Sequence, residues 1–358
     1  MGTVAALARR GVEVTLLAPR GPGDAALSAA ALADYFAVEG DIRLVQRESR
    51  WAGEALVRTL FWLRQVFCDE EIARADVLYS RIPAMLGMGG RSPLPFAVDH
   101  YRPWPDDLPV IRPLLRRTAR RDKCLGIILH SAFAAGAYER AGVPAEKLLV
   151  AHNGAEPGRM GPPADKAAAR AALGLDPDRF TIVYAGRVNA QKGLDQLMAL
   201  ASLRPEALFL LVGSEGEGPI EVEARKRANV RIVPWQAPAA LGAWLHAADV
   251  LLIPPSRAPL EQYRNCVLPL KLFAYLAAGR PILAPQAPDT AELLTDGETA
   301  LLVTPGNPET AAAALDRLRD PALAARLGAA AYARSGALTW DRRAEKIEAF
   351  LRARLSAG

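Results

Sequence analysis

The stretch Ile182–Leu197 reads IVYAGRVNAQKGLDQL and decides the fold of the second half of the chain. A short apolar run, typical of a buried parallel strand, ends at Gly186, and a helical pattern begins at Leu194. Arg187 and Lys192 lie in the turn between strand and helix. Two cations and several backbone N–H groups without a helical partner therefore gather at one helix N-terminus. This arrangement is typical of a site that binds a diphosphate.

The same alternation of short β-branched runs and longer helical segments continues in both halves of the chain. It is the pattern of parallel α/β sheets. The predicted strands are residues 11–19, 41–46, 75–80, 94–100, 124–131 and 147–154, and then 180–186, 207–214, 230–235, 248–256, 280–285 and 300–305. A chain of 358 residues is long enough for two domains of this kind.

The Gly- and Pro-rich segment 155–165 is the expected linker between these domains. The predicted parts are an N-terminal domain, a C-terminal domain and one terminal helix, over residues 1–157, 158–338 and 339–358. The chain opens on a helix that should end at Gly11, whereas a doubly wound domain normally begins with a strand and a glycine-rich turn. We therefore expect that the first strand is missing from the N-terminal domain and lies upstream of Met1.

Composition excludes several classes of protein. The sequence has no uncharged apolar run long enough for a membrane span, and no secretory signal opens it. The three cysteines, Cys68, Cys124 and Cys266, are scattered, so neither a disulfide framework nor a zinc site is expected. These features predict a cytoplasmic protein.

The segment Arg112–Lys123 carries a large share of the net charge of +5, with five arginines and one lysine. As a helix, it would turn Ile111, Leu114, Leu115 and Thr118 to one face and most of its arginines to the other. One interpretation is a solvated helix face over the core. The other is a basic amphipathic surface that docks on anionic lipid headgroups. Nucleic acid is not an expected partner, because no helix-turn-helix, RNP-like or zinc-finger signature accompanies the charge.

Six segments, in order along the chain, resemble landmarks of the family 4 glycosyltransferases. They are residues 7–19, 126–154, 185–193, 247–256, 291–303 and 339–351. The resemblance implies the GT-B fold, with two Rossmann-like domains facing a cleft and a C-terminal helix that crosses back to the first domain. It also implies transfer of a sugar from a nucleoside-diphosphate-sugar donor to an acceptor hydroxyl, with retention and without a metal or other cofactor.

In this family, the arginine and lysine that match Arg187 and Lys192, after the turn at Gly186, clamp the diphosphate of the donor. Electrostatics supports this role independently, because an enzyme without a metal needs cations and helix dipoles to stabilise the leaving nucleoside diphosphate. Each cation at ~4 Å contributes on the order of 4 kcal/mol in a partly screened cleft.

The helix that follows Pro269 departs from the family pattern. Ala274 stands where members commonly have the glutamate that accepts hydrogen bonds from the donor ribose, and an earlier glutamate of the same motif falls at Cys266. The loss of such a contact weakens donor binding by about ten- to a hundredfold. We expect Lys271 and Tyr275, four residues apart on one helix face, to replace part of it.

His100 ends a predicted strand of the first domain. The resemblance implies that it contacts the donor sugar, which makes it the candidate catalytic residue; the alternative is a loop histidine bonded to the backbone. Tyr101, Arg102 and Trp104 follow it and are candidates for the acceptor side.

Asp176 and Asp178 have the D-x-D spacing of metal-dependent transferases, but their place before a strand indicates a turn.

The implied partners are a nucleotide-sugar donor and a glycan or lipid acceptor of the cell envelope. Contact with anionic lipid through Arg112–Lys123 would place the protein peripherally at the inner face of the membrane.

Two alternatives stay open, both suggested by the family fold: a non-catalytic relative that acts as a partner or regulatory subunit, and a nucleotide-sugar epimerase. A dehydrogenase is not expected, because Gly213–Gly218 lacks the G-x-G-x-x-G spacing.

Overall fold

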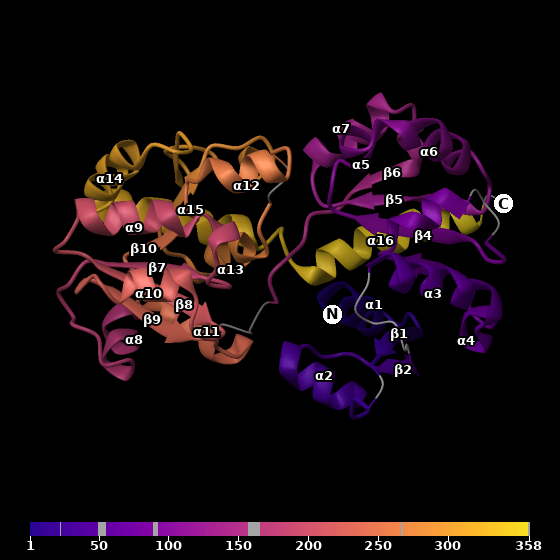
Figure 1. Cartoon of the computed structure of the whole chain (residues 1–358), viewed down its shortest axis with the longest axis horizontal. Helices are drawn as coiled ribbons and strands as arrows, with labels where there is room; N and C mark the ends of the chain where they lie inside the picture. The colour runs from indigo at the N-terminus through magenta and orange to yellow at the C-terminus, as the bar shows by residue number, and fades with distance from the viewer. Residues whose placement is uncertain (22, 49–54, 89–91, 157–164, 266–267, 357–358) are drawn as a thin grey trace. The chain divides into compact units, whose positions relative to one another are not determined.

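The computed structural model describes the whole chain except residues 22, 49–54, 89–91, 157–164, 266–267 and 357–358. The chain forms two compact units: unit 1 contains residues 1–152 and 340–358, and unit 2 contains residues 153–339. Both units consist of parallel strands connected by helices (Figure 1), so the expected α/β class is confirmed. The predicted linker lies mostly outside the described residues. The terminal helix belongs to unit 1.

Unit 1 contains two separate parallel sheets, with the orders β1-β2 and β3-β4-β5-β6. The strands are β1 (Val14–Arg20), β2 (Ile42–Glu48), β3 (Leu78–Ser80), β4 (Phe96–His100), β5 (Cys124–Leu129) and β6 (Leu148–Val150). The helices are α1 (Gly2–Arg9), α2 (Ala29–Phe36), α3 (Ala55–Cys68), α4 (Glu70–Ala73), α5 (Trp104–Asp107), α6 (Arg112–Ala119), α7 (Ala132–Arg140) and α16 (Trp340–Leu355). All six strands lie where the sequence predicts them.

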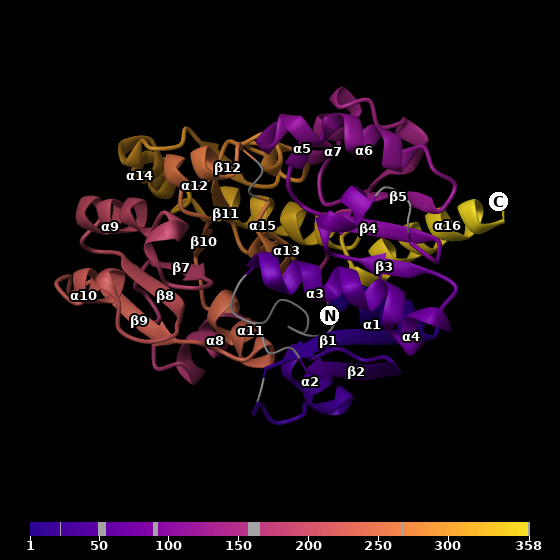
Figure 2. The same cartoon turned by 45° about the vertical axis from the view of Figure 1, so that its right-hand side comes forward.

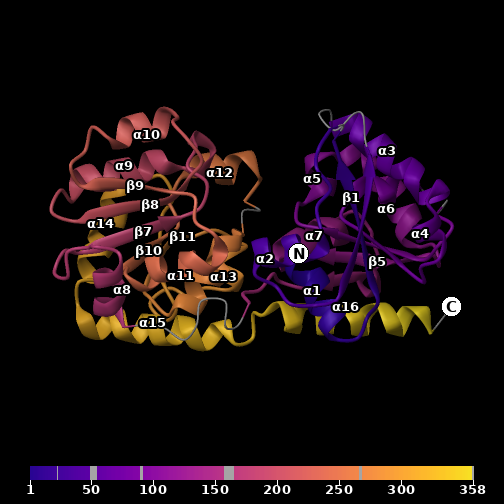
Figure 3. The same ribbon diagram turned by 90° about the horizontal axis from the view of Figure 1, so that it is seen from below.

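The helices α1 and α16 pack against each other and connect the two sheets of unit 1. Ala6 and Leu7 of α1 contact Ala344 of α16, which also packs on β5. Figure 3 shows α16 alongside α1, and Figure 2 shows the β1–β2 pair apart from β3 and β4. Among the described strands, none pairs with the second edge of β1 or of β3. The strand expected upstream of Met1 stays a prediction.

Unit 2 is built on one six-stranded parallel sheet with the order β12-β11-β10-β7-β8-β9. The strands are β7 (Thr181–Ala185), β8 (Leu208–Ser214), β9 (Val230–Pro234), β10 (Val250–Leu252), β11 (Ile282–Pro285) and β12 (Leu301–Val303). The helices are α8 (Lys166–Ala172), α9 (Leu194–Leu203), α10 (Pro219–Ala224), α11 (Pro238–His246), α12 (Arg257–Gln262), α13 (Leu270–Ala278), α14 (Pro308–Arg317) and α15 (Pro321–Ser335). These six strands also match the prediction.

Helices cover both faces of this sheet, which explains why its strands read as continuous apolar runs. The helices α9, α10 and α14 pack on one face, and α8, α11 and α13 pack on the other. The chain runs outward from β7 to β9 and then returns to β10 on the other side of β7. The carboxyl ends of β7 and β10 therefore form the topological switch point, where open α/β sheets bind their ligands.

The basic helix α6 turns a different face to the core than the sequence predicts. Leu115 and Thr118 are buried as expected, together with Ala119, but Leu114 is 39% exposed. The buried residues stand at i, i+3 and i+4 and form the stripe that packs on β5, so Leu114 lies about 100° around the helix from Leu115. The prediction that Leu114 faces the core was wrong.

Within the described part of the chain, no helix is long and apolar enough to cross a membrane.

Candidate functional site

The turn after β7 lies at the switch point of unit 2 and carries the residues that the sequence singles out. Gly186 has a φ of 143°, and its N–H donates to the carbonyl of Val212 at 2.9 Å. A Cβ on Gly186 would lie 2.9 Å from Nζ of Lys271, so only glycine fits without displacing this ammonium group. Arg187 follows directly, and Lys192 ends a short 3₁₀ turn over Ala190–Lys192.

Gly193 places the N-terminus of α9 beside the loop that follows β10. Its φ is 68°, and a Cβ there would lie 2.3 Å from the Cβ of Ser256. Because Gly193 is the N-cap and no side chain caps the helix, the first N–H groups of α9 are available to an external acceptor. The switch point thus offers a helix dipole beside Lys192, as the sequence predicts for a diphosphate site.

Three cationic side chains belong to this site. Arg187 is mostly exposed, and its Nε lies 3.4 Å from Oε1 of Glu215. Lys192 is exposed, whereas Lys271 is half-buried, with its Nζ 3.5 Å from the ring centroid of Tyr184. Within the described residues, neither lysine pairs with a carboxylate. The site therefore holds more positive charge than its surroundings neutralise, which favours an anionic ligand.

Burial lowers the pKa of Lys271 well below its usual range, and the charge of Lys192 lowers this pKa further. An anion bound at the turn would supply the missing counter-charge and favour the protonated form of Lys271. The pKa of Lys271 should therefore rise when a diphosphate binds.

We expect nucleoside diphosphate binding to take up protons at Lys271. The affinity should then fall as the pH rises from the lowered pKa of the free protein toward about 10.4, the ordinary value for lysine. Calorimetry in two buffers of different ionisation enthalpy measures the proton uptake. Lys271→Arg keeps the charge but does not titrate, so the uptake should disappear in this variant. Equal uptake in the wild type and in Lys271→Arg would contradict the assignment.

The two other candidates on α13 do not face the site in the way that was predicted. Tyr275 is fully buried; its hydroxyl accepts a hydrogen bond from the N–H of Ala185 at 2.8 Å and donates to the carbonyl of Leu252 at 3.3 Å. Ala274 is half-buried and packs against the core of unit 2. The prediction that Tyr275 joins Lys271 in replacing the ribose contact is therefore wrong, because its hydroxyl links the backbones of β7 and β10. Cys266 lies outside the described residues.

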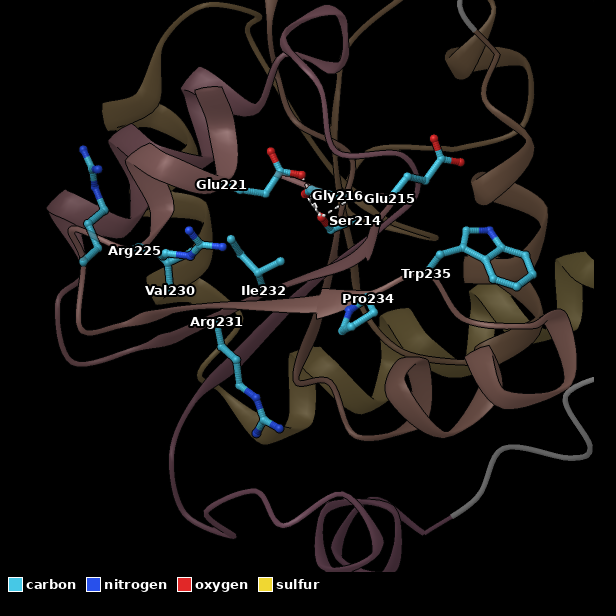
Figure 4. Close-up of a pocket in the computed structure, with 11 residues that line it drawn as sticks. Ser214, Glu215, Gly216, Glu221, Arg225, Val230, Arg231, Ile232, Pro234 and Trp235 are labelled. Carbon is cyan, nitrogen blue, oxygen red and sulfur yellow. Dashed lines mark hydrogen bonds between the residues drawn. The ribbon is translucent and has the colours of Figure 1, made fainter. Parts of the chain in front are cut away.

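A groove of about 890 Å³ opens beside Glu215, the ion-pair partner of Arg187 (Figure 4). Its walls are the carboxyl end of β8, the whole length of the edge strand β9, and the helix α10 with the arginines that follow it. Ser214 donates to the buried Glu221 at 2.7 Å on one side, and Trp235, 42% exposed, stands on the other. Sequence reasoning missed this groove. The signal was the polar, glycine-rich Gly213–Gly218 directly after a buried strand.

The histidine candidate lies in unit 1, at the carboxyl end of β4. His100 is buried, and its Nδ1 lies 3.1 Å from the hydroxyl of Tyr138. Burial lowers the pKa of His100 to about 4, against the opposing effect of a hydrogen bond to the backbone of Arg102. At neutral pH this imidazole is therefore uncharged, which suits a hydrogen-bonding role better than that of a cation.

The acceptor candidates follow His100 on the same edge of the sheet. Tyr101 is 47% exposed, and Trp104 begins α5 and is half-buried. Arg102 forms an ion pair with Asp107 at 2.9 Å. The rings of Tyr101 and Trp104 lie within 6 Å of the His100 ring, with centroid distances of 5.4 and 5.9 Å. These side chains form one aromatic cluster at the carboxyl end of the sheet.

A buried polar network adjoins this cluster, and sequence reasoning missed it. Asp99 accepts hydrogen bonds from Tyr79 at 2.6 Å, from His130 at 2.8 Å and from Arg343 at 2.8 Å. Arg343 comes from α16 and also donates to Thr3 at 3.1 Å. The carboxylate of Asp99 is held charged, because these donors lower its pKa well below the usual range in spite of burial. An aspartate inside the apolar run FAVDH was the available signal.

Two family models match the chain in consecutive parts. The model described as Glycosyltransferase Family 4 matches residues 2–159, and the model described as Glycosyl transferases group 1 matches residues 179–320. The chain belongs to the family 4 glycosyltransferases. The first match covers most of unit 1, and the second contains the turn with Arg187 and Lys192.

Curated relatives of this family 4 chain carry the name D-inositol 3-phosphate glycosyltransferase. The protein of Streptomyces avermitilis is 33% identical over 213 residues, which are 54% of this chain and 44% of the relative. That of Segniliparus rotundus is 30% identical over 226 residues, or 60% and 48% of the two chains. The chain thus matches about half the length of these relatives.

Solved structures show that the family 4 chain has the GT-B fold. The sucrose-phosphate synthase of Thermosynechococcus elongatus aligns with a TM-score of 0.76 at 20% identity, covering 99% of this chain and 92% of that one. Anabaena Alr3699/HepE, solved in complex with UDP-glucose, aligns with a TM-score of 0.71 at 18% identity, covering 98% and 94%. The expected fold is confirmed.

The D-x-D pair of this family 4 chain forms a turn, as predicted. The carboxylate of Asp176 accepts a hydrogen bond from the N–H of Asp178 at 2.9 Å, which closes the turn before β7. Among the described residues, no group of three or more His, Cys, Asp or Glu side chains is arranged to hold a metal ion.

Proposed function

We propose that the chain transfers a sugar from a nucleoside-diphosphate-sugar donor to a hydroxyl group of a glycan or lipid acceptor. The observation that carries this proposal is the cationic turn of unit 2: Arg187 and Lys192 lie between β7 and the uncapped helix α9, and Nζ of Lys271 lies beside Gly186. The names of the curated relatives and of the structural neighbours agree with the same class of reaction.

In the proposed reaction, the bond between the anomeric carbon and the diphosphate oxygen breaks while the acceptor oxygen bonds to the same carbon. Arg187, Lys192 and the α9 dipole stabilise the negative charge that develops on the departing diphosphate. The proton of the acceptor hydroxyl passes to a phosphate oxygen of the leaving group. Attack from the face that the diphosphate leaves gives retention, and the three cations take the place of a metal.

We assign the nucleoside of the donor to the groove beside Glu215. The groove adjoins Arg187, and Trp235 offers an aromatic surface on which a base can stack. UDP is the first nucleotide to test, because a structural neighbour was solved with UDP-glucose. Ala274 leaves the ribose without the carboxylate contact common in the family, so we expect a donor affinity below that of relatives that keep the glutamate.

The test is a panel of nucleotide sugars, incubated with the full chain in the presence and in the absence of a glycan or lipid acceptor, and analysed for free nucleoside diphosphate and for the glycosylated acceptor. We expect turnover with at least one donor and an anomeric proton in the product that shows retention. If no donor binds and none is turned over, the chain is a non-catalytic relative. Conversion of the donor to an isomeric nucleotide sugar without an acceptor would indicate an epimerase.

His100→Ala in the same assay tests the proposed sugar contact. We expect kcat/KM to fall by about ten- to a hundredfold, the loss of one or two hydrogen bonds to the substrate, while binding of the nucleoside diphosphate alone stays unchanged. Tyr138→Phe is the matched variant, since it removes only the hydroxyl that lies 3.1 Å from Nδ1 of His100. Full transfer activity in His100→Ala would exclude the role.

A further inference from the structure

An exposed apolar projection precedes and begins the helix α6. Val110 is 79% exposed, Leu108 is 44% exposed and Leu114 is 39% exposed. Pro109 and Pro113 between them are exposed as well. Single exposed apolar residues are common on protein surfaces, but here five of them lie within seven positions of the chain. We call these five residues the apolar tip.

Four arginines follow the apolar tip along the same helix and its C-terminal end. Arg116, Arg117, Arg120 and Arg121 are all exposed, and within the described residues none of them forms an ion pair. We call these four residues the basic band. Two neighbouring arginines behave differently and are neutralised by one aspartate, since Asp106 pairs with Arg112 at 3.0 Å and with Arg140 at 2.6 Å.

The apolar tip and the basic band occupy the exposed part of α6 and the chain on either side of it. Leu115, Thr118 and Ala119 form the buried stripe of α6. Leu114 and Arg117 stand at i and i+3 on the exposed part of α6, and Arg121 follows just after the helix ends at Ala119. The stem of Arg116 lies over Gly142, where a Cβ would come 3.0 Å from its Cδ. The surface therefore belongs to a helix that packs against the rest of unit 1 rather than to a free tail.

We propose that the apolar tip and the basic band dock unit 1 on an anionic lipid bilayer. An anionic bilayer supplies an apolar layer in which valine, leucine and proline can be buried. It also supplies headgroup phosphates that can pair with the arginines of the basic band. An acidic peptide or a nucleic acid would neutralise the basic band but would leave the apolar tip in water. This surface lies outside the donor site, so the inference holds whether or not the proposed reaction is confirmed.

Co-sedimentation of the full chain with vesicles tests the proposal. We expect binding to vesicles that contain one third phosphatidylglycerol to be at least tenfold tighter than binding to pure phosphatidylcholine. Val110→Asp with Leu114→Asp should lower binding to the anionic vesicles by at least tenfold, and so should Arg117→Glu with Arg121→Glu. The matched control is Arg74→Glu with Arg342→Glu, which makes the same charge change at exposed positions of unit 1 outside α6 and should bind like the wild type.

Three outcomes would overturn the inference. Wild-type binding by the Arg117→Glu, Arg121→Glu variant would exclude the basic band, and wild-type binding by the Val110→Asp, Leu114→Asp variant would exclude insertion of the apolar tip. Tight binding of a single-stranded RNA without vesicle binding would assign the surface to nucleic acid. All the substituted side chains are exposed, so unchanged thermal unfolding of each variant shows that a loss of binding is not a loss of fold.

Discussion

Arg187→Ala and Lys192→Ala should each lower kcat/KM for sugar transfer by about 10²–10³-fold, the typical loss when one preorganised donor to a developing oxyanion is removed. Both residues lie in the turn between β7 and the uncapped helix α9, where the leaving diphosphate is proposed to bind. Their charges act on the transition state more than on the ground state, because the negative charge on the diphosphate increases as the glycosidic bond breaks.

The measurements are initial rates with the best donor from the panel and calorimetric titration of the nucleoside diphosphate. Arg187 is mostly exposed and Lys192 is exposed, so the thermal midpoint of each variant should stay at the wild-type value. Glu215→Gln is an informative companion, since it removes the carboxylate 3.4 Å from Arg187 and should tighten nucleoside diphosphate binding. Wild-type affinity and rate in Arg187→Ala and Lys192→Ala together would contradict both the site and the proposed reaction.

Arg343→Met should destabilise unit 1 by about 3–5 kcal/mol, because it leaves the buried carboxylate of Asp99 without its cationic partner. Arg343 and Asp99 are both almost fully buried, and their side chains meet at 2.8 Å. The double variant Asp99→Asn, Arg343→Met removes both charges and should recover part of the loss. Because the pKa of Asp99 is lowered in the folded state, its contribution is present above the unfolded value of about 3.9 and disappears as the pH falls through the lowered pKa.

Hydrogen exchange of the amides in β4 and β5, followed with increasing denaturant, reports on unit 1 separately from unit 2. Arg342→Ala is the neighbouring control on α16. Its side chain is exposed and pairs with Glu345, so its loss should cost only about 0–1 kcal/mol. If the amides of β4 and β5 are protected to the same degree in Arg343→Met as in Arg342→Ala, the buried pair does not stabilise the unit.

Local patterns were sufficient to predict the strands and the turn between strand and helix that carries Arg187 and Lys192. Most of the described strands are short, largely apolar runs, and the run that ends at Gly186 already carries its cations in the next few residues. These features depend on neighbours in sequence, so their spacing is visible without the fold. The same applies to Gly11, which has a φ of 83° just after α1 ends at Arg9.

Features that depend on distant partners could not be predicted in this way. Asp99 and Arg343 are 244 positions apart, and Lys271 meets the ring of Tyr184 only because β10 returns beside β7. Tyr275 was placed in the donor site from its spacing to Lys271, but the sheet places its hydroxyl against two strand backbones. Leu114 was misplaced because α6 has only eight residues, too few for the buried face to be read from periodicity.

The discontinuity of unit 1 has a consequence for synthesis on the ribosome. Unit 2 is one continuous segment, so it can finish folding once Thr339 has left the exit tunnel. Unit 1 emerges first but cannot close its buried network until α16 delivers Arg343 from the last twenty residues. The nascent chain must therefore hold Asp99 without its arginine during the whole synthesis of unit 2. A chain that stops before α16 should then yield a folded unit 2 attached to an incomplete, chaperone-dependent unit 1.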